Sequence, residues 1–309
     1  MKSKLQPYAS LTGGTPIPTA MNRRHFLTWT SLATAGVLSS CSSPSHPANA
    51  PRRLRLSTSS IHFKELPIEQ ACEQIARLGF EGIDIWCAYD KCPHLDDVAA
   101  RLGPDGLKAL LARHKLKLFS FSVYIGGYAK YAELLGRAGG GVAIQGSAPP
   151  CKPAELSARM KTFLDDLKPL IELAEKHNSY LAIENHGNAL LDAPDSFKAF
   201  TDLNRSPRLG LAVAPYHLQA IGASVEEVIR IAGRQLFFFY AWQKQDGISQ
   251  LPGHGPTDFK PWLQALADAD YRGYVNPFKH GHVESDAMAA ALGKSRAYLR
   301  QQATPAWKI

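Results

Sequence analysis

After residue 50, strand and helix signals alternate eight times along the chain. Short apolar runs are each followed by a longer segment whose apolar residues recur every three or four positions. The predicted strands are 54–59, 82–86, 116–124, 142–145, 180–186, 209–215, 236–243 and 273–278. The predicted helices are 67–78, 104–114, 129–137, 153–177, 193–203, 224–232, 258–267 and 285–300. Continuously apolar strands indicate a parallel sheet covered by helices. Eight repeats favour a closed (β/α)8 TIM barrel, and no dinucleotide-binding glycine motif follows the first strand.

The chain divides into a leader, residues 1–50, and one large domain, residues 51–309. Asn22-Arg-Arg-His-Phe-Leu27 resembles a twin-arginine export signal, and Leu38-Ser-Ser-Cys41 resembles a lipobox. We therefore expect export to the periplasm, with a lipid anchor on Cys41 as the only membrane attachment. The start codon encodes either Met1 or Met21, which directly precedes the arginine pair.

The charge distribution disfavours a nucleic-acid partner. The formal net charge is +8, but Lys2, Lys4, Arg23 and Arg24 contribute four positive charges to a leader without acidic residues. The remaining +4 is scattered over the domain and often lies beside acidic residues, whereas a nucleic-acid site typically has a clustered basic stripe.

The segment Tyr180–His186 predicts a functional strand end. Glu184 and His186 are two residues apart, so on a strand they point to the same face. A carboxylate at the end of a buried apolar strand is unfavourable unless it is paired, protonated or bound to a metal. Since reactive groups of a TIM barrel gather at the carboxyl ends of its strands, Glu184 and His186 are candidate catalytic residues.

Other strand ends carry polar and aromatic residues that we expect at the same rim. His217, after the sixth strand, is the third candidate catalytic residue. The candidate substrate-binding residues are His62, Trp86, Tyr240, Gln243, Asn276, His280 and His282, and Asp84 and Tyr124 also lie at strand ends. The aromatic residues suit stacking on sugar rings or packing in the core, and each lone histidine also suits a structural role. Apart from Lys279 the strand ends carry few basic residues, which disfavours a phosphorylated substrate.

From about residue 54 to 298 the chain resembles the sugar phosphate isomerase/epimerase superfamily, the xylose isomerase-like TIM barrels. The resemblance rests on four segments: Leu78-Gly-Phe-Glu-Gly-Ile-Asp-Ile85, Leu181-Ala-Ile-Glu-Asn-His186, Gly253-His-Gly-Pro-Thr-Asp258 and Tyr271-Arg-Gly-Tyr-Val275. It implies one divalent ion held by Glu, Asp, His and Glu on strands five to eight. It also implies proton transfer next to a substrate carbonyl.

The chain departs from this ligand pattern at three of the four positions. Glu184 matches the first ligand, and His217 matches a substrate-contacting histidine of the family. Ala214 replaces the aspartate, the seventh strand has no histidine, and the eighth has no glutamate. One hypothesis is a rebuilt Mn, Zn, Fe or Ni site of Glu184, His186, His217 and His280. The other, which we favour because no spacing demands the rebuilt set, is metal-free acid–base catalysis by Glu184.

The sequence therefore predicts an isomerase, epimerase or lyase acting on a sugar or sugar derivative. Glu184 is the expected base, and His186 or His217 the acid, in a reaction through an enediol-like intermediate. The alternative is a non-catalytic carbohydrate-binding lipoprotein with a decayed active site. The identity of the sugar and the oligomeric state have no signature in the sequence.

Overall fold

A computed structural model of the chain describes residues 53–305 and 307, which belong to one compact unit. The predicted export signal, lipobox and Cys41 lie outside the described residues. Within them, no helix combines the length and the apolar character that a membrane crossing requires.

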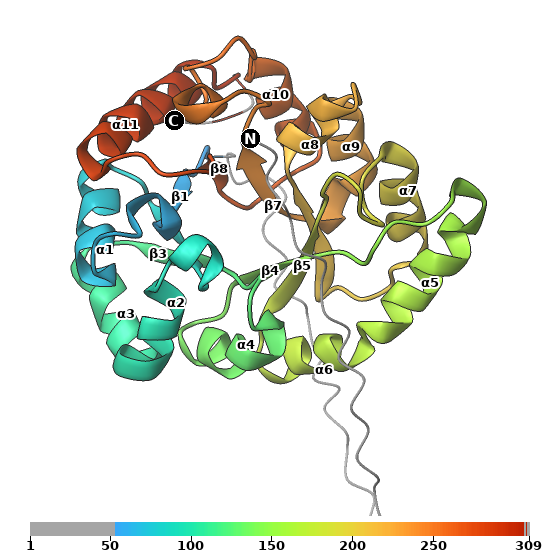
Figure 1. Cartoon of the computed structure of the whole chain (residues 1–309), viewed down its shortest axis with the longest axis horizontal. Helices are drawn as coiled ribbons and strands as arrows, with labels where there is room; N and C mark the ends of the chain where they lie inside the picture. The colour runs from blue at the N-terminus through green and yellow to red at the C-terminus, as the bar shows by residue number, and fades with distance from the viewer. Residues whose placement is uncertain (1–52, 306, 308–309) are drawn as a thin grey trace, which may run out of the picture. The chain divides into compact units, whose positions relative to one another are not determined.

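Eight parallel strands form one sheet in sequence order. They are β1 (Ser57–Ser59), β2 (Gly82–Trp86), β3 (Lys117–Ser122), β4 (Val142–Gly146), β5 (Tyr180–Glu184), β6 (Leu209–Val213), β7 (Leu236–Ala241) and β8 (Val275–Pro277). A parallel bridge between Leu56 and Val275 joins the first edge to the last. Figure 1 shows the strands as a central ring inside a ring of helices. The predicted (β/α)8 barrel is confirmed.

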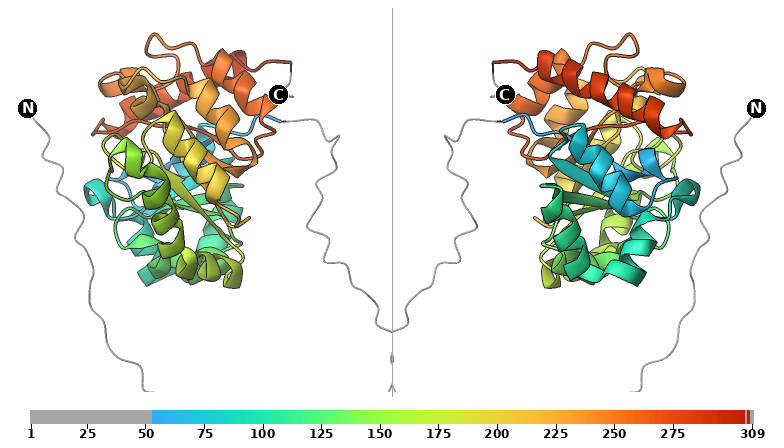
Figure 2. Two further views of the ribbon diagram at one scale, coloured as in Figure 1. Left: turned by 90° about the vertical axis from the view of Figure 1, so that its right-hand side faces the viewer. Right: turned by 90° about the vertical axis from the view of Figure 1, so that its left-hand side faces the viewer.

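The helices pack around the outside of the barrel (Figure 2). They are α1 (Ile68–Arg77), α2 (His94–Asp97), α3 (Gly103–Arg113), α4 (Gly127–Arg137), α5 (Leu156–Asp166), α6 (Lys168–Lys176), α7 (Pro194–Leu203), α8 (Pro215–Ala220), α9 (Val225–Ala232), α10 (Lys260–Asp268) and α11 (Ser285–Gln301). The single helix predicted for 153–177 is wrong, because Pro169 lacks an N–H and the chain forms α5 and α6 instead. The short α8 was not predicted.

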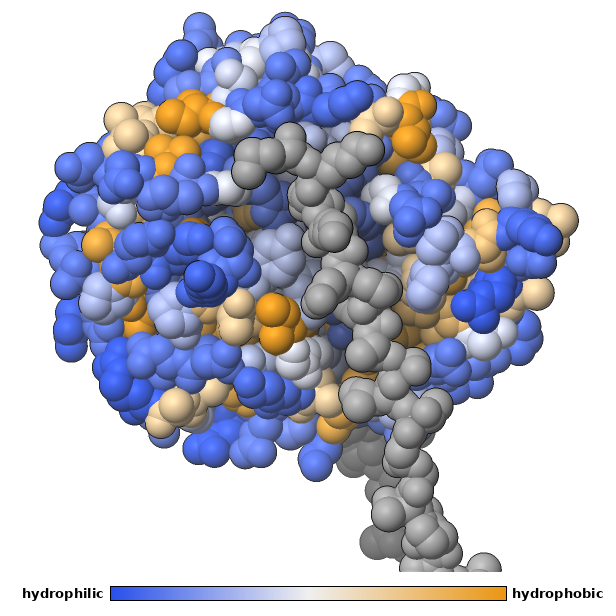
Figure 3. Space-filling view, in the orientation of Figure 1, coloured by the Kyte–Doolittle hydropathy of each residue, from blue (hydrophilic) through white to orange (hydrophobic). Residues whose placement is uncertain are grey.

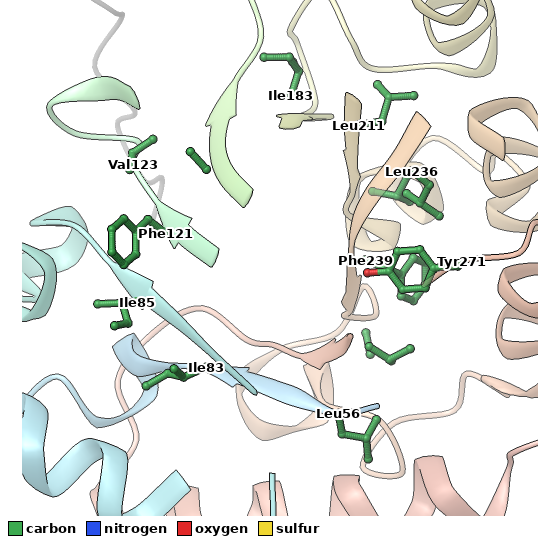
Figure 4. Packing of buried hydrophobic residues seen from close by; sticks show 14 of the residues in the cluster. Leu56, Ile83, Ile85, Phe121, Val123, Ile183, Leu211, Leu236, Phe239 and Tyr271 are labelled. Atoms are coloured by element: carbon green, nitrogen blue, oxygen red, sulfur yellow. The ribbon is translucent and has the colours of Figure 1, made fainter. Parts of the chain in front are cut away.

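Successive side chains point to opposite faces of each strand, so the buried apolar residues form two cores, one between the strands and the helices and one inside the barrel. Residues such as Ile83, Ile85 and Ile183 point from the strands toward the helices (Figure 4). The intervening residues point into the barrel, where Phe119 stacks on Phe238 with ring centroids 4.8 Å apart. Phe119 and Phe238 are each the third of six residues in their strands, so these rings occupy the barrel interior before the carboxyl ends of the strands, where the residues of the candidate site lie.

The outer surface is mostly hydrophilic on the face shown in Figure 3, where hydrophobic residues form small separate patches. Among the described residues, the large apolar side chains that are more than about a third exposed are Ile125, Tyr180, Leu203 and Ile221. Most large apolar side chains of the described residues are therefore buried in the two cores.

Candidate active site

Asp84 on β2 is the first of two buried carboxyl groups inside the barrel. Four neighbours donate hydrogen bonds to it. Ser59 Oγ donates to Oδ2 at 2.8 Å, Ser120 Oγ donates to Oδ1 at 2.8 Å, and Ser122 Oγ lies 3.0 Å from both oxygens. The fourth donor is Trp86 Nε1. Burial raises the pKa of Asp84 to about 6, although all four donors favour the carboxylate.

Glu184 on β5 is the second buried carboxyl group, and it has far fewer partners. Its register partners on the neighbouring strands are Gly146 and Ala212, which provide little or no side chain beside it. Tyr124 forms a hydrogen bond with it. Burial raises the pKa of Glu184 to about 8, the hydrogen bond from Tyr124 opposes this rise, and the charge of Asp84 adds to it. Glu184 is thus mostly protonated at neutral pH and, once ionised, is a stronger base than an ordinary carboxylate.

A series of hydroxyl groups connects the two carboxyl groups. Ser122 Oγ, which contacts Asp84, lies 3.4 Å from the Tyr240 hydroxyl, and the Tyr240 and Tyr124 hydroxyls are 3.0 Å apart. Tyr124 then contacts Glu184. Each hydroxyl has one hydrogen to donate. The protonation state of Glu184 therefore constrains which member of each pair in the series donates the hydrogen bond.

Asn185 joins β5 to β6. Its Oδ1 accepts a hydrogen bond from Ala214 N at 2.7 Å, and its Nδ2 donates to Ala214 O at 3.2 Å. The side-chain amide thereby continues strand pairing beyond the end of β5. Since Ala214 directly precedes α8, this amide positions His217 on α8.

His186 and His217 lie together, as the sequence predicted. Their ring centroids are 4.1 Å apart, and His217 also makes an edge contact with Trp242 at 5.2 Å. Burial, with a smaller contribution from His186, lowers the pKa of His217 to about 3. His217 is therefore a neutral imidazole at pH 7. His186 is exposed, and its Nδ1 donates to Gly187 O at 2.9 Å.

An aromatic wall, formed by Trp86, Trp242, Phe278 and His280, lines the β8 side of the barrel mouth. Trp86 stacks on Phe278 at 5.1 Å, and His280 contacts Trp242 at 4.9 Å. Gln250 supports this wall, because its Oε1 accepts from Trp242 Nε1 at 2.7 Å and from His280 N at 3.1 Å. Burial lowers the pKa of His280 to about 4, so this ring is also neutral at pH 7.

Four predicted substrate-binding residues have their polar atoms engaged with the protein. Asn276 lies between Ser57 and Ser59, at 2.8 and 3.0 Å. His62 bonds to Thr58 and to the N–H of Lys279, and both amide atoms of Gln243 bind backbone groups of its own loop. His282 is half-exposed, between Glu65 and Glu284. Of the other three predicted residues, Tyr240 belongs to the hydroxyl series, and Trp86 and His280 belong to the aromatic wall. Sequence reasoning missed Gln250, which lies in a loop without any strand-end signal.

The side chains do not fit the four-ligand metal centre that the family implies. Ala214 and Asn276 occupy two of the ligand strands, and the Asn276 amide is already hydrogen-bonded. Among the described residues no group of three or more His, Cys, Asp or Glu side chains is arranged to hold a metal ion, and the rebuilt set predicted above is not assembled.

Solved structures similar to this chain are also barrels of this kind. A 3-keto-D-glucoside 4-epimerase, YcjR, from E. coli matches with a TM-score of 0.63 and 16% identity, covering 81% of this chain and 100% of that one. The D-psicose 3-epimerase of Clostridium cellulolyticum H10 matches with 0.60 and 15%, covering 80% and 99%. The IOLI protein with a binding zinc atom matches with 0.64 and 15%, covering 83% and 100%. At these identities the similarity establishes the fold. No curated protein matches the sequence.

A family model described as xylose isomerase-like TIM barrel matches residues 72–301, well over half of the chain. The match includes the strands that carry Asp84, Glu184 and Asn276. The chain belongs to the xylose isomerase-like TIM barrel family.

Proposed function

We propose that the protein is a sugar isomerase, epimerase or lyase in which Glu184 transfers a proton next to a substrate carbonyl. The observation that supports this most is the state of Glu184. It is a buried carboxyl group with small residues on both sides, one hydrogen-bond partner and a pKa of about 8. Structural carboxyl groups in protein interiors are normally well hydrogen-bonded, whereas a general base needs a free lone pair and a pKa near the working pH.

In the proposed reaction, ionised Glu184 removes the proton from the carbon next to a ketone or aldehyde. The electrons of the broken C–H bond form the C=C bond of an enediolate, and the negative charge moves to the carbonyl oxygen. Delivery of a proton to the opposite face by an acid other than Glu184 gives an epimer, and transfer of the proton from Glu184 to the neighbouring carbon gives an isomer. Loss of a β-leaving group instead gives an elimination product.

His217 is the proposed hydrogen-bond donor to the developing enediolate oxygen. As a neutral imidazole it donates an N–H without becoming a competing acid, and a neutral imidazole matches the enediolate better in proton affinity than an imidazolium would. The exposed His186 beside it is the proposed route for proton exchange with solvent.

The hydroxyl series supports the same role for Glu184. When Glu184 is ionised, Tyr124 donates to it and Tyr240 donates to Tyr124. When Glu184 holds the substrate proton, the series can reverse, with Tyr124 donating to Tyr240 and Tyr240 to Ser122. Both protonation states are therefore hydrogen-bonded, as a residue that alternates between base and acid requires.

Two of the similar solved structures are named as a 3-keto-D-glucoside 4-epimerase and a D-psicose 3-epimerase. Epimerisation of a sugar is one of the reactions proposed here. The aromatic wall supports the rival function, a barrel that stacks on a sugar and does not transform it.

The test is exchange of substrate hydrogen for solvent deuterium, with a panel of keto-sugars. We expect the protein to exchange the hydrogen next to the carbonyl of at least one member. Glu184→Gln should slow this exchange by about 10²–10⁴-fold and change sugar affinity little. Glu172→Gln, the same change on the exposed side of α6, is the control and should leave both unchanged. Sugar binding without exchange in the unmodified protein would establish the binder instead.

A further inference from the structure

Lys279, two residues beyond the end of β8, is a buried lysine whose charge has few partners. Only 2% of its surface is exposed. Within the described residues its ammonium donates one hydrogen bond, to Gly281 O at 2.6 Å, although an ammonium has three N–H donors. No acidic side chain of the described residues forms an ion pair with it, and burial lowers its pKa, opposed by the more distant Asp90. Lysines are rarely this buried without a paired charge.

Lys279 lines a pocket at the carboxyl end of the barrel, between the loops that follow β1, β2 and β8. His62, Lys64, Asp90 and His280 also line it. Lys64 Nζ is 2.7 Å from Asp90 Oδ2, so these two charges compensate each other. His62 and His280 are neutral at pH 7, because their pKa values are lowered to about 3 and about 4. His282 also lines the pocket and lies between Glu65 and Glu284. Lys279 is thus the lysine of this pocket that has no ion-pair partner among the described residues.

Ring contacts link the side chains of this pocket to the surroundings of Glu184. His280 contacts Trp86 and Trp242 of the aromatic wall. Trp86 contacts the Tyr124 ring at 5.2 Å, and Tyr124 is the hydrogen-bond partner of Glu184. A sugar lying along the wall would reach from the lysine toward the base.

We propose that this pocket is an anion subsite in which Lys279 binds the carboxylate of a sugar acid. One unpaired positive charge matches one carboxylate better than a phosphate dianion, and the free N–H donors of the ammonium would complete their hydrogen bonds on it. The inference deepens the proposed function by naming a substrate class, but the binding it predicts does not require turnover.

The test compares pyranose ligands by calorimetric titration of the full chain at pH 7: D-glucuronate and D-galacturonate against D-glucose and D-glucose 6-phosphate. We expect at least one sugar acid to bind about tenfold or more tightly than the neutral sugar and the phosphate. Lys279→Met should remove most of that preference, by about tenfold or more, and leave glucose affinity unchanged. Lys91→Met, the same change on the exposed loop outside the pocket, is the control.

The melting temperature provides a second readout. Lys279→Met should raise Tm by a few degrees, since it removes a poorly compensated buried charge and keeps the chain length. If Lys279 is purely structural, Tm should fall and sugar-acid affinity should stay unchanged, which would overturn the proposal. Equal binding of acids and neutral sugars, no binding of any acid, or a preference for the phosphate would also overturn it. None of these outcomes affects the deuterium-exchange test of Glu184, so the two proposals fail separately.

Discussion

Asp84 and Glu184 lie in the same barrel interior and are both buried, but their surroundings differ. Asp84 has four hydrogen-bond donors from three strands, whereas Glu184 has one, with glycine and alanine as its register neighbours. Burial raises both pKa values, to about 6 and about 8 respectively. The comparison shows that burial alone does not define a reactive carboxyl group. Asp84 has its oxygens occupied by four donors, whereas Glu184 keeps acceptor capacity, which the proposed general base requires.

The largest expected effect separates the two carboxyl groups by stability. Asp84→Ala removes the acceptor of Ser59, Ser120 and Ser122 and leaves three buried hydroxyls without it, so the free energy of unfolding should fall by about 3 kcal/mol or more. Glu184→Gln should raise it at pH 7, because the folded protein then no longer has to bind a proton at this position. Urea denaturation of both variants measures the difference. Equal losses would show that both carboxyl groups are anchors.

The pH dependence sharpens the same comparison. If ionised Glu184 is the base, kcat/KM should rise about tenfold per pH unit and level off near pH 8. The folded-state pKa of Glu184 lies above its ordinary value of 4.5, so the folded protein binds the extra proton between these values. Its contribution to stability is complete below about pH 4.5 and is lost as the pH rises through 8. Glu184→Gln should remove that loss, and a pH–rate profile that levels off near pH 6 would instead point to Asp84.

The smallest expected effect concerns the link between the two groups. Tyr124→Phe removes the hydrogen bond that stabilises ionised Glu184, so the pKa seen in the pH–rate profile should rise by up to about one unit. The rate at the alkaline plateau should fall less than about tenfold. A kinetic pKa that is lower or unchanged in this variant would contradict the direct contact between Tyr124 and Glu184.

Local patterns in the sequence predicted the barrel and the positions of Glu184, His186 and His217 at or beyond the ends of β5 and β6. Glu184 was identified because its apolar strand and its polar end are contiguous. The predicted neighbours His186 and His217 were found together because each follows the end of an adjacent strand.

What the sequence determined by itself is the barrel, because alternating apolar periods are local and eight of them leave few other arrangements. It also determined which residues reach the carboxyl rim. The tertiary structure decided which of those residues are free to act. Asn276 is bound by Ser57, 219 positions away, and His62 by Lys279, 217 positions away. Such pairings depend on how distant strands meet when the barrel closes, so no local pattern distinguishes them from the poorly partnered Glu184.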